Sequence, residues 1–120
     1  MHNFQELKLW NKAMDVAVET YKLTSTFPIE EKYGLTSQIR RSAISVPSNI
    51  AEGAGRNTDG EFLNFLGIAN GSSYELQTQL ILSYRLDLTS EAEVEPILND
   101  LTEVQKMNFV FMNNLKNKNL

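Results

Sequence analysis

The sequence of 120 residues contains no cysteine, and its one histidine, His2, follows the first residue. Without cysteine, the chain has no disulfide, no thiolate metal site and no cysteine nucleophile. We expect His2 to lie in a frayed terminus, which argues against histidine metal sites and Ser-His-Asp triads. No apolar run approaches the roughly 18–20 residues of a membrane span, and no signal-peptide pattern opens the sequence. We therefore expect a cytoplasmic protein without a membrane partner.

Positive charge is also scarce, because 15 acidic side chains stand against 11 lysines and arginines, for a net charge of −4. Residues 27–56 hold a small positive excess, whereas residues 87–120 hold six acids against three lysines. This distribution is typical of an ordinary solvated surface. Taken alone, it gives only weak support to nucleic-acid contact.

Apolar residues recur at spacings of three and four in four stretches, as amphipathic helices require. Pro28 stops the first stretch, and the capping boxes Thr58-x-x-Glu61 and Ser90-x-x-Glu93 begin the last two. The sequence predicts an all-α fold, an antiparallel up-down-up-down four-helix bundle forming a single domain over residues 1–120. The expected helices span about residues 6–23, 30–54, 59–86 and 91–115.

Local features refine this bundle. Pro47 interrupts the second helix, and a kink is favoured over two separate pieces because the apolar stripe keeps its phase. Gly67 and Gly71 weaken the third helix, which predicts a close backbone crossing as compensation. We expect residues 113–120 to fray. The expected inward stripe of the first helix is Leu7, Trp10, Met14, Ala17 and Tyr21.

Trp10 is the sole tryptophan, and its stripe position predicts that it is largely buried, between helices or beneath a neighbouring subunit.

A polar stripe follows the second helix beside its apolar face, and a polar pair lies one turn apart on the third. These residues are Gln38, Arg41, Ser45, Ser48, Asn49, Glu52, Glu75 and Gln79. A solvated helix face is usually richer in Lys and Glu, so this composition favours a contacted surface. Two interpretations stay open: an interhelical or subunit seam with satisfied hydrogen bonds, and a groove for a ligand or nucleic acid.

Catalytic patterns are missing. Di-metal four-helix bundles use Glu-x-x-His pairs on facing helices, which one histidine cannot supply. Gly53-Ala54-Gly55 lacks the Lys and Ser or Thr of a phosphate-binding P-loop. We expect no catalytic residue, no metal site and no cofactor. An enzyme with an all-carboxylate metal site is the remaining alternative, which metal analysis of the purified protein decides.

Several segments carry a family resemblance: Phe4-x-x-Leu7-x-x-Trp10-x-x-Ala13, Phe27-Pro28-x-x-Glu31-x-Tyr33-Gly34-Leu35-x-x-Gln38-x-Arg40-Arg41, Ser45-Val46-Pro47-Ser48-Asn49-Ile50-Ala51-Glu52-Gly53, Arg56, Glu61, Phe65-Leu66 and Gly71-Ser72-x-x-Glu75-Leu76-x-Thr78-Gln79-Leu80. The chain resembles the small bacterial proteins encoded in intervening sequences of large-subunit ribosomal RNA genes, often labelled as a ribosomal protein. The matching residues span 4–80, and the fourth helix matches only as an amphipathic pattern. The resemblance implies an antiparallel bundle that assembles as a ring-shaped homopentamer.

The resemblance also implies kinship with the accessory protein of diversity-generating retroelements, a partner of nucleic acid and reverse transcriptase. That relative is strongly basic, whereas this chain is acidic, and affinity for phosphate backbones rests on positive charge. The matching Arg40, Arg41 and Arg56 are the candidate nucleic-acid contacts. The family offers no catalytic residues to carry over.

The leading hypothesis is a non-enzymatic oligomeric binding or scaffold protein associated with ribosomal RNA or its processing. The alternative is an RNA-binding accessory protein that acts through a basic ring of a homopentamer. The expected partners are copies of the chain itself and RNA. The sequence identifies no protein partner.

Overall fold

Proline, glycine and capping side chains divide the chain into four α-helices. The computed structural model describes residues 1–118. Within these residues there is no β-strand, and the expected all-α four-helix bundle is confirmed. The helices are α1 (Lys8–Thr24), α2 (Leu35–Ala54), α3 (Asp59–Arg85) and α4 (Glu91–Lys118), with 3-10 turns η1 (Phe4–Glu6) and η2 (Ile29–Glu31).

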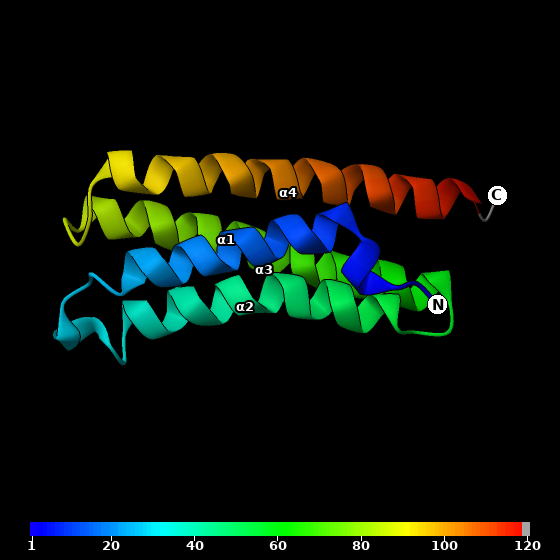
Figure 1. Ribbon diagram of the computed structural model, residues 1–120, viewed down its shortest axis with the longest axis horizontal. Helices are drawn as coiled ribbons and strands as arrows, with labels where there is room; N and C mark the ends of the chain where they lie inside the picture. The colour runs from blue at the N-terminus through cyan, green and yellow to red at the C-terminus, as the bar shows by residue number, and fades with distance from the viewer. Residues whose placement is uncertain (119–120) are drawn as a thin grey trace.

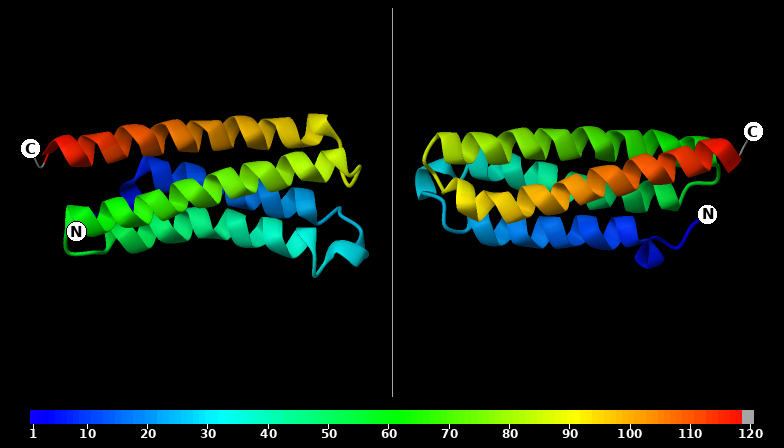
Figure 2. Two further views of the ribbon diagram at one scale, coloured as in Figure 1. Left: turned by 180° about the vertical axis from the view of Figure 1, so that it is seen from behind. Right: turned by 90° about the horizontal axis from the view of Figure 1, so that it is seen from above.

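The helices lie side by side in an elongated bundle of 49 × 23 × 20 Å, and consecutive helices run in opposite directions in Figure 1. In the view from above in Figure 2, α4 crosses the other helices obliquely. α2 packs against α1 and α3, and α4 packs against the same two helices. The α1–α2 groove and the α3–α4 groove therefore lie on opposite faces of the bundle.

Residues from all four helices form one apolar core. Leu35 and Phe111 follow the apolar spacing of α2 and α4 but are only half-buried. The other apolar side chains at this spacing are buried. They are Ile39, Ala43, Val46, Ile50 and Ala54 in α2, and Val94, Ile97, Leu101, Val104 and Leu115 in α4. Asn108 is buried among them and donates from Nδ2 to the carbonyl of Leu66, 3.1 Å away, which joins α4 to α3.

The expected inward stripe of α1 is wrong. The buried residues of α1 are instead Leu9, Ala13, Val16, Thr20, Leu23 and Thr24. Met14 and Tyr21 are each 38% exposed, and Trp10 is only half-buried. α1 is apolar over a wide arc, and the smaller side chains let it approach its neighbours closely. The bulkier ones lie at the flank, over the α1–α2 groove.

α2 begins at Leu35 and not near residue 30 as expected. η2 is a separate turn, and Gly34 precedes the helix with φ −108° and ψ −116°, outside helical geometry. Glu31 nevertheless contacts the start of α2, because its Oε2 accepts from the Leu35 amide at 3.3 Å. α2 runs through buried Pro47 as one helix, and the kink there stays a prediction.

The close helix crossing also lies elsewhere than expected. Gly67 and Gly71 face outward on α3, and a Cβ added at either would meet nothing within 4 Å. The glycine at a close approach is Gly53 of α2. A Cβ there would lie 2.7 Å from Cβ of Phe65 and 2.8 Å from Cδ1 of Phe62. The absence of a side chain at Gly53 thus lets the end of α2 approach α3.

We expected both ends of the chain to fray, but the described residues at each end make ordered contacts. The His2 amide donates to the Ala54 carbonyl at 2.8 Å, and the His2 ring lies 5.0 Å from the Phe62 ring. α4 stays helical to Lys118 because Leu115 is buried and the Lys118 ammonium lies 3.7 Å from Asp59. Residues 119–120, also expected to fray, lie outside the described residues.

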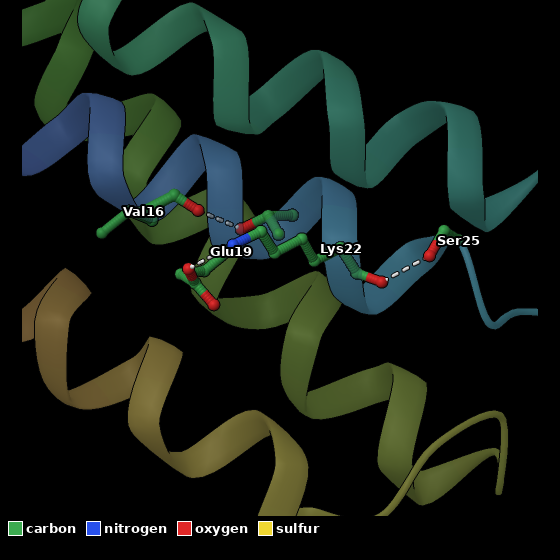
Figure 3. A network of polar contacts seen from close by, with 5 residues as sticks. Val16, Glu19, Lys22 and Ser25 are labelled. Atoms are coloured by element: carbon green, nitrogen blue, oxygen red, sulfur yellow. Dashed lines mark hydrogen bonds and ion pairs between the residues drawn. The ribbon is translucent and has the colours of Figure 1, made fainter.

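Side-chain hydroxyls mark the helix ends. Thr58 Oγ1 accepts from the Glu61 amide at 3.1 Å, and Ser90 Oγ accepts from the Glu93 amide at 3.2 Å. After the end of α1, Ser25 Oγ donates to the Lys22 carbonyl at 2.6 Å (Figure 3). These bonds use backbone groups that helix ends leave without partners.

Candidate functional site

Hydrogen-bonded side chains form a polar seam between α2 and α3. The polar seam consists of Ser42, Ser45, Asn49, Ser72, Glu75 and Gln79. Ser42 Oγ donates to Glu75 Oε1 at 2.7 Å. The hydroxyl oxygens of Ser45 and Ser72 lie 2.8 Å apart. These two bonds cross from one helix to the other and position α2 against α3.

The remaining members extend the polar seam. Asn49 Nδ2 donates to the Ser45 carbonyl at 2.8 Å and to the Ser45 hydroxyl at 3.0 Å. Gln79 Nε2 donates to Glu75 Oε1 at 3.4 Å. The structure thus brings Ser45, Asn49, Glu75 and Gln79 of the expected site together inside the chain's own α2–α3 contact.

The other members of the expected polar stripe face solvent. Gln38, Arg41, Ser48 and Glu52 are exposed on α2. Glu52 pairs with Arg56, one turn away, at 3.3 Å. No carboxylate within residues 1–118 pairs with Arg41.

The three candidate nucleic-acid arginines do not lie together. Arg40 and Arg41 lie near the start of α2, and Arg56 follows its end. At 1.5 Å per residue, about 20 Å of helix separates the first two from Arg56. Arg56 lies over the Phe65 ring at 4.8 Å in addition to its ion pair with Glu52. Only Arg40 and Arg41 share a surface.

That surface is a cavity of about 510 Å³ between the end of α1 and the start of α2, here called the cationic pocket. Its lining residues are Tyr21, Lys32, Tyr33, Thr36, Ser37, Arg40, Arg41 and Ile44. The lining contains three cations and no carboxylate. The whole chain carries a net negative charge, so this positively charged pocket is a local exception.

Contacts with α1 hold Arg40 in place. Its Nε donates to Thr24 Oγ1 at 2.9 Å, and its guanidinium lies 4.6 Å from the centre of the Tyr21 ring. On the other side of the pocket, the Lys32 ammonium lies 5.4 Å from the centre of the Tyr33 ring. Each ring therefore has a cation beside it.

The part of the α1–α4 groove near the end of α1 and the start of α4 is acidic. It has a volume of about 660 Å³, and its charged lining residues are Asp15, Glu19, Lys22, Glu93 and Asp100. Glu19 and Lys22 pair at 3.5 Å along α1 (Figure 3). Nearby, Lys12 contacts Asp100 at 3.1 Å, and this hydrogen bond raises the pKa of Lys12 above its ordinary value.

Two further features concern metals and membranes. Residues 1–118 contain no group of three or more His, Asp or Glu side chains placed to hold a metal ion. In the same part of the chain, no helix is both long enough and apolar enough to cross a bilayer.

Two apolar grooves occupy opposite faces. The α1–α2 groove is lined by Phe4, Trp10, Met14, Ala17, Ile44, Pro47, Ser48 and Ala51. The α3–α4 groove is lined by Tyr74, Thr102, Gln105, Lys106, Phe109 and Val110. Ile44 lines both the α1–α2 groove and the cationic pocket, so these two surfaces are continuous.

Sequence reasoning missed Tyr21, Lys32, Tyr33 and Thr36 as neighbours of Arg40. One local signal was available, because Thr36 and Arg40 lie four residues apart and so share a helix face. Tyr21 joins the pocket only through the packing of α1 on α2, which spacing along the chain does not encode.

Comparisons with known proteins complete this picture. No curated protein matches the chain. A crystal structure of a protein of unknown function from the S23 ribosomal protein family of Bacteroides thetaiotaomicron is similar, with 28% identity and a TM-score of 0.81. The match covers 88% of this chain and 95% of that chain. The family model described as 23S rRNA-intervening sequence protein matches residues 5–109. The chain therefore belongs to the 23S rRNA-intervening sequence protein family.

Proposed function

We propose that this protein is a non-enzymatic, cytoplasmic binding or scaffold protein that assembles with copies of itself and associates with ribosomal RNA or its processing. The observation that carries the proposal is the exposure of large apolar side chains on two opposite faces. Met14 and Ile44 are exposed at the α1–α2 groove. Tyr74, Phe109 and Val110 are exposed at the α3–α4 groove. Contiguous exposed apolar surface is typical of protein contacts.

Two different patches on opposite faces support a head-to-tail contact. In such a contact, the α1–α2 face of one copy packs against the α3–α4 face of the next, and a suitable rotation closes a ring. The number of five subunits comes from the family resemblance. The link to ribosomal RNA is supported by the description of the matching family, which names 23S rRNA.

We propose no reaction, because the side chains of the polar seam are bonded to one another. The carboxylate of Glu75 accepts from Ser42 and Gln79, and Ser45 is bonded to Ser72. These groups act on one another as structural contacts, so we assign them no role in chemistry.

Size-exclusion chromatography with light scattering at micromolar concentration tests the assembly. We expect a mass near five chains. Ile44→Glu and Phe109→Glu place a charge in opposite faces, and each variant alone should give one-chain particles. Leu86→Glu is the matched control, because Leu86 is similarly exposed but follows the end of α3. A one-chain mass for the unmodified protein contradicts the proposal.

A second candidate function is an RNA-binding accessory protein that acts through a basic ring of the homopentamer. The unneutralised cations of the cationic pocket favour it, since a ring repeats them and multiplies weak contacts. Arg56 is a weaker contributor, because Glu52 pairs with it. Binding to structured RNA is measured over a salt titration, and no binding at about 50 mM salt, where such contacts are strong, removes this candidate.

A further inference from the structure

We infer that the cationic pocket binds one nucleotide unit, with the phosphate held by its cations and the base stacked on its tyrosine rings. The ligand chemistry is a phosphate beside an unstacked base, whether in a free mononucleotide or in a single strand. The inference rests on the second candidate function, RNA binding, only in naming RNA as the source of the nucleotide. The pocket itself is formed within one chain.

Arg40 supplies a positioned cation. Its Nε is bonded to Thr24 and its guanidinium lies over the Tyr21 ring, so the guanidinium is held in place before a ligand arrives. The terminal amino groups of a guanidinium match the oxygens of a phosphate and bind two of them side by side. Arg41 and Lys32 add two further positive charges on the same lining. No carboxylate within residues 1–118 pairs with these three cations.

The start of α2 adds donors to the same pocket. Gly34 brings no capping side chain, and Glu31 takes only the Leu35 amide. The amides of Thr36 and Ser37 fall in the first turn, where a helix leaves N–H groups without an internal partner. This end of a helix carries partial positive charge and favours phosphate. Both residues line the pocket.

Thr36 gives an independent indication of a polar ligand. Its residue is only 7% exposed, yet its Oγ1 has no hydrogen-bond partner. Buried hydroxyls are nearly always bonded, so this one calls for an explanation. Because Thr36 also lines the pocket, a phosphate oxygen bound there is the proposed acceptor for this hydroxyl.

The tyrosine rings distinguish a nucleotide from a bare anion. Tyr33 is 89% exposed with Lys32 beside it, and Tyr21 flanks the other side next to Arg40. Unpaired bases stack on such rings, while cations track the backbone. The volume of about 510 Å³ lies within the range of small-ligand pockets. A carboxylate from a second copy would pair with the cations but leave Tyr33 uncovered.

Two titrations test the inference at about 50 mM salt, where electrostatic contacts are strong. One follows the anisotropy of an end-labelled single-stranded uridine 12-mer, and the other follows the heat of binding of uridine monophosphate. Lys32→Glu combined with Arg41→Glu should weaken binding by about tenfold or more. Tyr33→Ala should weaken it by about fivefold or more through lost stacking. Lys116→Glu, which reverses an exposed charge at the far end of α4, should change it less than about twofold.

If both ligands bind, a free nucleotide is sufficient for binding. If only the 12-mer binds, the ligand is a single strand. Either result supports nucleotide binding in the cationic pocket. The inference is overturned if neither binds. It is also overturned if a sulfated polymer without bases competes equally and Tyr33→Ala has no effect. Light scattering of the same samples separates the two proposals. If five-chain particles form but bind no nucleotide, the scaffold function stands and the nucleotide site is overturned.

Discussion

Gly53 shows how one missing side chain sets the distance between two helices. Any Cβ at this position would overlap Phe65 and Phe62 at 2.7 and 2.8 Å. The Phe65 atom in this contact is its Cβ, which moves only with the backbone of α3. We therefore expect Gly53→Ala to lower the free energy of unfolding by about 1–3 kcal/mol through overpacking. Urea denaturation measures this, and an unchanged or higher stability contradicts the close approach.

Gly67 provides the matched comparison, because the same substitution there meets open space. Alanine stabilises a helix interior by roughly 1 kcal/mol relative to glycine. Gly67→Ala should therefore raise the free energy of unfolding by up to about 1 kcal/mol. The same urea titration checks it. A clear loss of stability would show that the outward face of α3 is covered.

Lys12 and Asp100 link α1 to α4 across 3.1 Å, and their contact predicts a pH dependence. The hydrogen bond to Asp100, and then its charge, raise the pKa of Lys12 above 10.5. The folded protein thus holds this proton more tightly than the unfolded chain. The stabilisation is fully present below pH 10.5 and is lost as the pH rises through the raised pKa. Both side chains are substantially exposed, so the contribution is small.

The test compares Asp100→Asn with the unmodified protein in thermal melts from about pH 7 to about pH 11. The variant should melt slightly lower at neutral pH, and this difference in melting temperature should narrow toward the alkaline end. Glu95→Gln is the control, since it removes an exposed acid of α4 that does not contact Lys12. A difference in melting temperature that widens as the pH rises contradicts the assigned effect of Asp100 on Lys12.

The helices differ in how far their sequences predict their packing. In α2 and α4 one apolar stripe is bounded by polar residues, so the spacing identifies Ile50 and Leu101 as core. α1 offers two overlapping stripes, and periodicity alone does not choose between Trp10 and Leu9. The choice depends on how closely neighbouring helices approach, which is a property of the assembled bundle. The same reason explains why Gly53 was not distinguished from Gly67.

The polar sites were predictable only in part. Ser45 and Glu75 belong to a stripe whose composition departs from a solvated face, so the sequence identified them. Their partners Ser42 and Ser72 were missed, because a small hydroxyl fits an apolar stripe as easily as a polar one. The cationic pocket needs a ring from α1 beside a cation from α2, and that pairing exists only after the helices pack.

At the scale of the whole molecule, Trp10 reports on assembly. It lies half-buried beside Phe4 in the α1–α2 groove, with ring centres 5.1 Å apart. In the proposed head-to-tail ring, the α3–α4 face of the next copy covers this groove. Phe109→Glu, on the opposite face, should therefore shift Trp10 emission to the red and increase quenching by iodide. A one-chain mass with unchanged emission would show that the interface does not cover Trp10.

The N-terminus and the end of α4 lie at one end of the bundle, and the α1–α2 connection with Lys32 and Tyr33 lies at the other (Figure 1). Copies that meet through their long side faces keep their long axes side by side. The proposed ring is then a two-sided disc, with all N-termini and α4 ends on one side and all cationic pockets on the other. A tag on either terminus would tether every subunit from the same side, so an immobilised ring would present all its pockets to solution at once.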